Sequence, residues 1–318
     1  MIQIIRWNIA PQALPGRNLS DPDRLIDIAE KLRANETRDE ALEDQFRHIL
    51  ANLRMSGTWK RTGKRRLPLT ERALLAHLTR AENTIKVLDI GASDGTTSLE
   101  LLWALRQRFG DGSQVYSTDL NLWLNRYRRG PIYEYRASNG EATLVRVGFL
   151  GIRVADSRAD GGRSSDVLGS LYLRCKKFRK HMIFDKKIPL VHPLVRREAG
   201  ISIKELDCLV FDASFAEKFT AVRASNVLNL GYFSPDQIDI ALTHIYAYLQ
   251  NNGYLLVSRN RDESMGEQEH GSVWRKVAGK FFHVADFGAG SEIRQYVELW
   301  RQHASTQFSM AQISNGPI

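Results

Sequence analysis

The sequence predicts an α/β protein with a doubly wound, mostly parallel sheet of seven strands, N-terminal helices and a basic, β-rich insertion. Two observations lead to this fold class. Residues 85–101, IKVLDIGASDGTTSLEL, contain a short apolar run, a glycine turn and the start of a helical pattern, which is the order of a strand–turn–helix unit. Apolar runs and helical patterns alternate again over residues 201–299. A chain of 318 residues, 43% of them hydrophobic, can form such a core.

Residues 1–84 are predicted to form an N-terminal helical region. Two stripes of apolar residues at helical spacing lie between residues 20 and 55, and Ser20 followed by Pro22 suits the start of the first helix. A third helix is predicted over residues 70–81. Before it, residues 57–68, GTWKRTGKRRLP, form either a solvated basic linker or a segment that contacts an anion near the site.

The glycine turn at residues 91–95 is predicted to follow a buried strand, at the edge of the sheet where α/β proteins bind ligands. Gly91 and Gly95 permit backbone angles and a close approach that a Cβ would block. A dinucleotide fingerprint needs glycine at its first, third and sixth positions, and these hold Gly91, Ser93 and Thr96. NAD and FAD are therefore disfavoured.

This stretch resembles motif I of the class I S-adenosylmethionine (SAM) methyltransferases, which consists of a hydrophobic strand, an acidic residue and Gly-x-x-x-Gly. An ordinary strand–turn–helix of another α/β protein is the alternative. The resemblance implies a Rossmann-like methyltransferase core over residues 85–121 and 201–302, with SAM as the cofactor. The implied cofactor contacts are Asp89, Gly91, Ala92, Ser93, Asp94, Gly95 and Thr96.

The second strand is predicted over residues 114–119 and ends in an acid, Asp119. A carboxylate at a strand tip can accept hydrogen bonds from both ribose hydroxyls of a nucleoside. The resemblance gives this role to Asp119, with Leu120 beside it. A turn or capping role for Asp119 is the alternative.

Residues 122–200 break the alternating pattern and are predicted to be an insertion. Residues 133–136 and 142–147 alternate around a Ser-Asn-Gly turn, which indicates a β-hairpin. His181 and His192 could act as a general base, but a surface or packing role is the stronger expectation for each.

The net charge of +9 is concentrated in this insertion. Residues 122–205 contain 18 Lys and Arg against 8 Asp and Glu, a local formal charge of +10. We therefore expect an anionic acceptor: a small molecule, a glycan-lipid or an acidic protein. Aromatic residues are few among the basic ones, so nucleic acid is less favoured, and a solvated basic surface is the alternative. The candidate substrate contacts are Lys176, Lys177, Arg179 and Lys180.

Residues 206–212 are predicted to form the third strand. The resemblance places its last residue, Asp212, and the following Ala213 beside the adenine of SAM, while a capping role for Asp212 is the alternative. Residues 219–230 supply the next strand. Its end, Asn226-Val227-Leu228 followed by Tyr232-Phe233, resembles the segment that borders the methyl-transfer site in chemotaxis-receptor (CheR-like) methyltransferases, which makes Arg223 and Asn226 the catalytic candidates.

The last part of the predicted core contains a helix, a strand and a closing hairpin. Ser234-Pro235 with Gln237 indicates a helix that begins with a capping box, and residues 254–258 form the strand after it. Residues 281–287 and 293–299 are predicted to pair as the closing hairpin, whose last strand is antiparallel to the sheet. Residues 303–318 form a polar tail.

Composition limits the function classes. The two cysteines, Cys175 and Cys208, cannot form a disulfide framework or a zinc site, so a cytoplasmic setting and no metal are expected. No apolar run approaches the ~20 residues of a membrane span. The sequence therefore predicts a SAM-dependent methyltransferase with an unidentified acceptor. The alternatives are a non-catalytic binding or scaffold protein with this fold and an NAD-dependent oxidoreductase.

Overall fold

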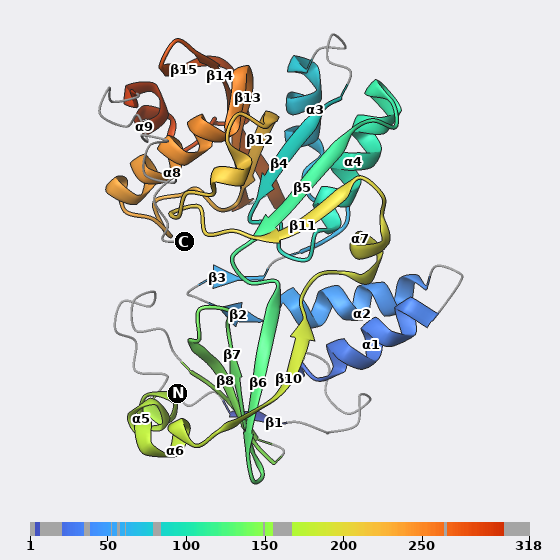
Figure 1. The fold of residues 1–318 in the computed structure, drawn as a ribbon, viewed down its shortest axis with the longest axis vertical. Coiled ribbons are helices and arrows are strands. Elements are labelled where there is room, and N and C mark those ends of the chain that lie inside the picture. Colours follow the sequence, from blue (N-terminus) through green and yellow to red (C-terminus); the bar gives the residue numbers. More distant parts are fainter. Residues whose placement is uncertain are drawn as a thin grey trace, which may run out of the picture.

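The computed structural model describes residues 4–6, 21–34, 39–51, 53–55, 58–60, 62–78, 84–148, 150–154, 167–263 and 266–301. Figure 1 shows two sheets, one above the other, and the upper one carries the glycine turn between β4 and α4. The predicted cap at Ser20 and the tail at residues 303–318 lie outside the described residues. None of the described helices is both long and apolar enough to cross a membrane.

The upper sheet has seven strands, as predicted, and its first five strands are parallel to one another. Two antiparallel pairings add the last two strands. In spatial order the strands are β11 (Ile201–Glu205), β5 (Gln114–Asp119), β4 (Lys86–Ile90), β12 (Phe219–Ser225), β13 (Leu249–Glu263), β14 (Gly266–Val277) and β15 (Lys280–Phe287). The order reverses between β4 and β12, which is the topological switch point of the sheet.

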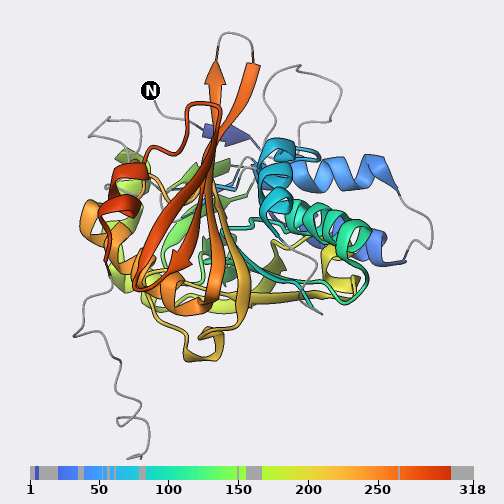
Figure 2. The ribbon, with the colours of Figure 1, turned by 90° about the horizontal axis from the view of Figure 1, so that it is seen from above.

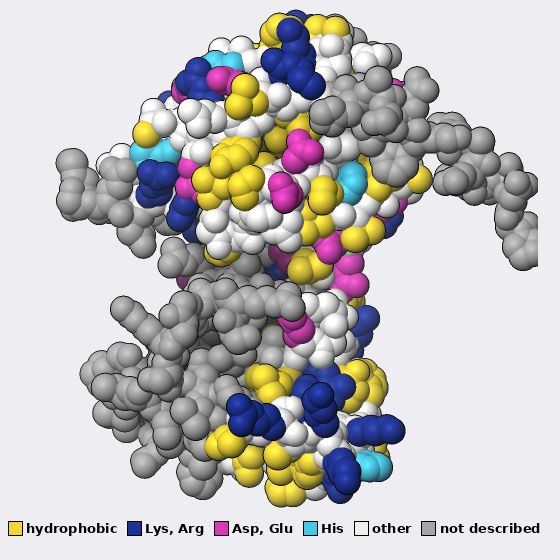
Figure 3. Space-filling view, turned by 90° about the vertical axis from the view of Figure 1, so that its left-hand side faces the viewer, with side chains coloured by type: hydrophobic (Ala, Val, Ile, Leu, Met, Phe, Trp, Pro, Cys, Tyr) yellow, Lys and Arg dark blue, Asp and Glu magenta, His cyan; other side chains and the backbone are white. Residues whose placement is uncertain are grey.

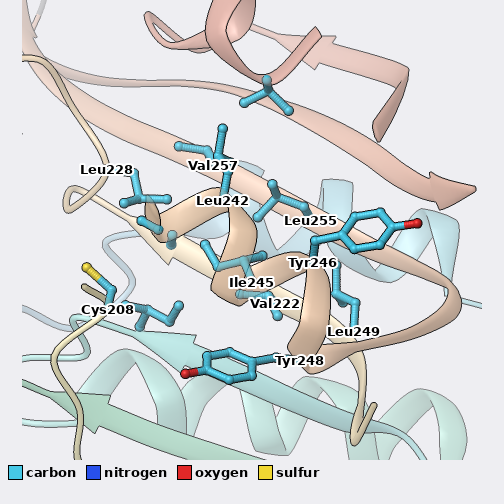
Figure 4. Packing of buried hydrophobic residues seen from close by; sticks show 14 of the residues in the cluster. Cys208, Val222, Leu228, Leu242, Ile245, Tyr246, Tyr248, Leu249, Leu255 and Val257 are labelled. Atoms are coloured by element: carbon cyan, nitrogen blue, oxygen red, sulfur yellow. The ribbon is translucent and has the colours of Figure 1, made fainter. Parts of the chain in front are cut away.

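Helices cover both faces of this sheet (Figure 2). Because side chains alternate along a strand, Val87 of β4 joins the cluster under α3 (Pro68–His77) and α4 (Thr96–Phe109), whereas Leu88 joins the cluster under α8 (Pro235–Tyr248) and α9 (Arg294–Leu299). Figure 4 shows Leu242 and Ile245 of α8 packed among the strand residues of the second cluster. Each such fully buried side chain contributes roughly 1.5–3 kcal/mol.

The predicted capping box at the start of α8 is confirmed. The backbone N–H of Gln237 donates to Ser234 Oγ at 3.3 Å, and the N–H of Ser234 donates to Gln237 Oε1 at 3.0 Å. Pro235 occupies the first turn, where its missing N–H costs nothing.

The third strand lies earlier in the chain than predicted. It is β11, residues 201–205, while the residues expected to form it, 206–212, are irregular and lead into a short 3₁₀ turn at Ala213–Phe215. The apolar run of residues 206–211 misled the prediction because it packs as a loop: Leu206 and Cys208 are buried under α8 without strand pairing.

The closing hairpin also differs from the prediction. Residues 281–287 do form a strand, β15, but its partner is the preceding β14, and residues 294–299 form the helix α9. The two strands are joined by Ala278 and Gly279, whose φ angles of +45° and +79° suit the tight turn of a two-residue hairpin. The strand β14 was missed because its sequence is polar and rich in glycine.

The lower sheet is antiparallel throughout, in the described part of the chain. It confirms the predicted hairpin, which is formed by β7 and β8. The spatial order is β1 (Ile4–Arg6), β9 (Leu150–Arg153), β8 (Ala142–Val147), β7 (Ile132–Arg136), β6 (Trp123–Arg129) and β10 (Ile183–Pro189).

The first two helices, α1 (Arg24–Ala34) and α2 (Glu40–Ala51), pack on the lower sheet. Leu25 and Phe46 of these helices share a buried cluster with Leu124 and Tyr135 of the strands. The division into residues 1–84, 85–121 with 201–302, and 122–200 stays a prediction. The remaining elements are β2 (Arg54–Met55), β3 (Thr58–Trp59), α5 (Val167–Arg174), α6 (Lys176–Lys180) and α7 (Pro193–Arg197).

Candidate functional site

The candidate site lies at the carboxyl ends of the parallel strands. The glycine turn follows β4, Leu120 follows β5, and Asn226 follows β12. Because β4 and β12 flank the switch point, the connections leave them in opposite directions, and open α/β sheets bind their ligands at such a point. The sequence prediction and the topology therefore select the same edge of the sheet.

The glycine turn is held in an unusual backbone conformation. The φ angles of Gly91, Ser93 and Gly95 are +75°, +58° and +83°. The N–H groups of Gly91 and Ala92 both donate to the carbonyl oxygen of Thr118, at 2.8 and 2.9 Å, which ties the turn to β5. Ser93 Oγ is buried and has no hydrogen-bond partner among the described residues.

Asp94 lies directly before Gly95, the N-cap residue of α4, and bonds to the first helical residue. Its carboxylate accepts from the N–H of Thr96 at 3.0 Å and from Thr96 Oγ1 at 2.8 Å, and it is 1% exposed. The carboxylate therefore satisfies helix donors, and the protein encloses Asp94 and Thr96, two of the predicted cofactor contacts.

Asp89 and Arg223 form a buried ion pair beneath the turn. Arg223 donates through Nε to Asp89 Oδ1 at 2.9 Å and through Nη2 to Oδ2 at 2.5 Å, and Ser98 Oγ donates to the same carboxylate at 2.6 Å. Arg223 is completely buried and Asp89 is 2% exposed. Burial alone would lower the pKa of Arg223, but the charge of Asp89 outweighs it and raises this pKa. The structure thus places this catalytic candidate inside the sheet–helix layer.

Asp119 lies where the prediction places it, beside the glycine turn. Its Oδ2 accepts from the N–H of Ser93 at 2.9 Å, and its Oδ1 accepts from the N–H of Asn121 at 2.9 Å. A third partner was not foreseen: Lys60 Nζ forms an ion pair with Oδ1 and donates to the carbonyl oxygen of Asn121 at 2.8 Å. Because Oδ1 is saturated, a nucleoside would find its free acceptor capacity on Oδ2.

Lys60 belongs to a basic segment that crosses the turn, which we call the strap (Lys60 and residues 62–66). Thr62 Oγ1 donates to Asp94 Oδ1, and the N–H of Arg65 donates to Glu100 Oε1 at 2.8 Å. Residues 57–68 were expected to be either a solvated basic linker or a segment that contacts an anion near the site. The position of the strap fits the second hypothesis better, although its lysines contact carboxylates of the protein. Sequence reasoning had no signal for this, since Lys60 and Asp119 are 59 residues apart.

Asn226, the second catalytic candidate, is paired with β13. Its Oδ1 accepts from the N–H of Asn260 at 2.7 Å and its Nδ2 donates to Asn260 Oδ1 at 3.2 Å, while Asn260 Nδ2 donates to the carbonyl oxygen of Arg66 in the strap at 3.1 Å. The next residue, Val227, faces the glycine turn so closely that a Cβ on Gly91 would lie 1.9 Å from its Cγ2. A side chain at position 91 would therefore clash with Val227 before it could contact a ligand.

Asp212 contacts residues outside the glycine turn. It caps the 3₁₀ turn by accepting from the N–H of Ser214 at 3.0 Å and forms an ion pair with Lys204 at 2.5 Å. Burial would raise its pKa, but Lys204 and the Ser214 donors lower it. These contacts fit a capping role for Asp212 better than a contact with adenine, and Ala213 forms part of the same short turn.

Asp207 was missed by the sequence reasoning. It follows β11 directly after Leu206, whose N–H donates to the carbonyl oxygen of Asp119 at 3.1 Å, and its side chain is exposed. It therefore lies at the strand end that Asp212 was expected to occupy. The signal was the alternation of Ile201 and Ile203, which marks the true strand.

The insertion reaches the site through α7. The N–H of His192 donates to the carbonyl oxygen of Asp94 at 2.9 Å, and its ring packs edge-on against Phe46 with ring centroids 5.2 Å apart. A Cβ on Gly95 would lie 2.7 Å from Val195 Cγ1. His192 is thus a packing residue, as expected, and Gly95 is required for this close approach.

The candidate substrate contacts lie far from the turn. Figure 1 places α6 at the opposite end of the molecule from β4 and α4. Lys176, Lys177 and Lys180 are exposed on α6, whereas Arg179 pairs with the buried Glu134 at 2.8 Å. No group of three or more His, Cys, Asp or Glu side chains suited to a metal ion occurs in the described ranges.

No family model and no curated protein matches the chain. Similar solved structures include the CMeT domain of the citrinin polyketide synthase, which is 15% identical with a TM-score of 0.31 over 62% of this chain and 35% of that one. They also include a geranyl diphosphate methyltransferase in complex with SAM, at 11% identity and TM-score 0.28 over 60% and 48% of the two chains. The [4+2]-cyclase SpnF, at 15% identity and TM-score 0.28 over 62% and 46%, is similar as well.

The chain spans about a third to a half of the length of these structures. Scores this low describe a likeness in part of the fold and carry no argument about activity. The local resemblance to chemotaxis-receptor methyltransferases stays a prediction.

Proposed function

We propose that the protein is a SAM-dependent methyltransferase. The observation that supports this most directly is the hydrogen bond from the N–H of Ser93 to Asp119 Oδ2 at 2.9 Å. It joins the glycine turn after the first strand to the acid at the tip of the second, beside the switch point. A nucleoside with a charged amino-acid arm needs a ribose acceptor next to a turn without bulky side chains, and this arrangement offers both.

The residues at the turn fit SAM in two further respects. Ser93 Oγ is a buried hydroxyl that finds no hydrogen-bond partner in the described part of the chain, and it lies next to the acid. Oδ2 of Asp119 keeps acceptor capacity for one ribose hydroxyl, and Asp207 follows β11 at the same edge, where it can accept from an adenine amine. Sites for the cofactor would thus be Ser93, Asp119 and Asp207, on a turn shaped by Gly91 and Gly95.

The roles of the protein groups follow from the reaction class. SAM, when bound, supplies a methyl group activated by a sulfonium. The chain therefore has to bind, orient and exclude water, and a base is needed only if the acceptor holds a proton that it does not lose easily. The strap and Val227 cover the turn, which suits the exclusion of water. Arg223 and Asn226 would position the turn and the strap through Asp89 and Asn260.

The acceptor is proposed to be anionic, on the basis of the charge of the insertion. Because α6 lies at the far end of the molecule, its lysines would attract an acceptor or its carrier without contacting the reacting atoms. Charge reversal on α6 should then weaken the salt-sensitive capture of the acceptor and leave the affinity for SAM unchanged.

A second function has a specific observation in its favour. Lys60 neutralises Asp119, and Val227 fills the space above Gly91, which would suit a methyltransferase fold kept as a non-catalytic binding or scaffold subunit. Calorimetry with SAM, S-adenosylhomocysteine and NAD separates the alternatives. Binding of SAM and S-adenosylhomocysteine, but not NAD, followed by methyl transfer to an acceptor, supports the enzyme. No binding of any of the three supports the scaffold, and binding of NAD alone supports the oxidoreductase.

A further inference from the structure

Large apolar side chains are exposed at the end of the molecule farthest from the glycine turn. Leu171 on α5 is 51% exposed, and Ile183 and Phe184 at the start of β10 are 75% and 53% exposed. Exposing such residues singly is common, but three of them on adjoining elements form a patch that needs a reason.

Ile183 and Phe184 lie at the same end of the six-stranded sheet, on its two faces, because side chains alternate along a strand. Phe184 packs edge-on against Tyr127 of β6 with ring centroids 5.7 Å apart, whereas Ile183 lies opposite Arg128 on the other face. Tyr172 Oη of α5 lies 3.2 Å from Sδ of Met182, the residue directly before Ile183. The helix α6 is fastened to the same strands, because Arg129 donates to the carbonyl oxygen of Phe178 at 3.0 Å.

Exposed basic residues surround this patch. We define the tip surface as the three apolar residues with their exposed basic neighbours: Leu171, Ile183, Phe184, Arg128, Arg174, Lys176, Lys177, Lys180 and Lys186. Figure 3 shows hydrophobic and basic side chains gathered together over the lower part of the molecule, where Figure 1 places α5 and α6.

Two acids near the tip surface, within the described ranges, are already neutralised. Asp185, the acid within residues 171–187, pairs with Arg126 at 2.5 Å. Glu134, on the sheet behind, is completely buried and bound by Arg136, Arg179 and Tyr172. The lysines of α6 therefore present positive charge that the described neighbours leave uncompensated.

We propose that the tip surface docks the protein on an anionic lipid bilayer. The tip surface combines exposed apolar side chains with exposed lysines, and a bilayer offers a partner for each. The apolar groups can enter the headgroup–acyl boundary, while the lysines contact lipid phosphates. A nucleic-acid partner would explain the charge but not the aliphatic residues. Bases stack on aromatic side chains, so Phe184 could contact a base in this way, but Ile183 and Leu171 could not. The proposal does not depend on the methyl-transfer activity.

Co-sedimentation of the full chain with lipid vesicles tests this docking. We expect binding to vesicles of equal parts phosphatidylcholine and phosphatidylglycerol, weak binding to phosphatidylcholine alone, and weaker binding as salt is raised. The triple variant Lys176→Glu, Lys177→Glu, Lys180→Glu should bind about a hundredfold more weakly, since each lysine near an anionic surface contributes about 1 kcal/mol. The double variant Ile183→Ser, Phe184→Ser should also bind more weakly at low salt, where charge alone would suffice.

Matched controls use exposed residues elsewhere. The triple variant Arg72→Glu, Arg108→Glu, Arg275→Glu changes the net charge equally, and Ile240→Ser, Phe282→Ser removes apolar side chains that are each 43% exposed. The apolar control should bind like the wild type, and the charge control should lose less than the α6 variant. Circular dichroism checks that each variant folds.

Three results would overturn the proposal. The first is an absence of binding to the anionic vesicles. The second is vesicle binding that falls equally in the α6 variant and its charge control. The third is binding that the double apolar variant retains in full while single-stranded DNA competes for it, because this would identify a charge-only surface for nucleic acid.

Discussion

The two sheets of this protein organise polar groups differently. In the seven-stranded sheet the cofactor candidate Asp119 lies at the carboxyl end of its strand, and the buried ion pair of Asp89 and Arg223 lies beneath the glycine turn. In the six-stranded sheet, charged residues lie on the strand faces: Glu134 of β7 is completely buried and bound by two arginines. A buried charge at a strand end can serve a ligand, whereas a buried charge in a strand face must be neutralised by the protein. This difference predicts how each sheet responds to substitution.

The largest effect is expected at the ion pair under the glycine turn. Asp89→Asn keeps the shape of the side chain but leaves Arg223, which is completely buried, without its countercharge. Breaking such a pair costs about 3–5 kcal/mol, which urea unfolding would measure. Glu298→Gln, in an exposed pair with Arg294 on α9, should cost less than about 1 kcal/mol. Equal costs for the two variants would contradict the structural role of Asp89.

A somewhat smaller effect is expected at the turn itself. Gly91→Ala places a Cβ 1.9 Å from Val227 Cγ2 at a φ of +75°. Overpacking and backbone strain together cost about 2–4 kcal/mol. Gly140→Ala is the matched control, because its φ is +83° but no described atom lies within 4 Å of the added Cβ, so strain alone remains. Thermal unfolding should rank Gly91→Ala as clearly less stable than Gly140→Ala, and the reverse order would show that the side chain of Val227 moves away without cost.

The charged face of the six-stranded sheet should respond less strongly. Glu134→Gln removes the countercharge of Arg136 and Arg179, each of which is 21% exposed and can reach water. We expect a loss of about 1–3 kcal/mol near neutral pH, below that of Asp89→Asn. Burial would raise the pKa of Glu134, but its arginine and tyrosine partners lower it. Its contribution is therefore present above the ordinary glutamate pKa and is lost as the pH falls below it.

An effect of the opposite sign is expected at Glu71 of α3. Burial raises the pKa of Glu71 to about 7, and Glu100, Glu269 and Asp89 act in the same direction against Arg223. Its contribution to stability is present below a pH of 4.5 and is lost as the pH rises toward 7. The wild type should thus lose stability between pH 4.5 and 7, and Glu71→Gln should lose less over the same range. Urea midpoints at a series of pH values measure this difference. An unchanged pH profile would contradict the raised pKa.

The sequence predicted local features well in both sheets. The glycine turn, the capping box of α8 and the hairpin of β7 and β8 depend on residues close in the chain, so spacing and turn chemistry reveal them. The prediction failed where a segment packs without regular pairing, as at residues 206–212, and where a strand is polar, as in β14. Distant contacts were also missed: nothing local connects Lys60 with Asp119, and the burial of Arg223 follows from its place in the sheet.

The central claim is that SAM binds against Asp119 at the glycine turn, and calorimetry on matched variants tests it most directly. Asp119→Asn removes the charge that would hold the ribose, while Asp111→Asn changes an exposed aspartate in the turn that follows α4. Since a charge-assisted hydrogen bond contributes roughly 1.5–3 kcal/mol, Asp119→Asn should bind SAM about tenfold to a hundredfold more weakly, and Asp111→Asn should bind like the wild type. Equal SAM affinity in all three proteins, or no SAM binding by the wild type, would contradict the claim.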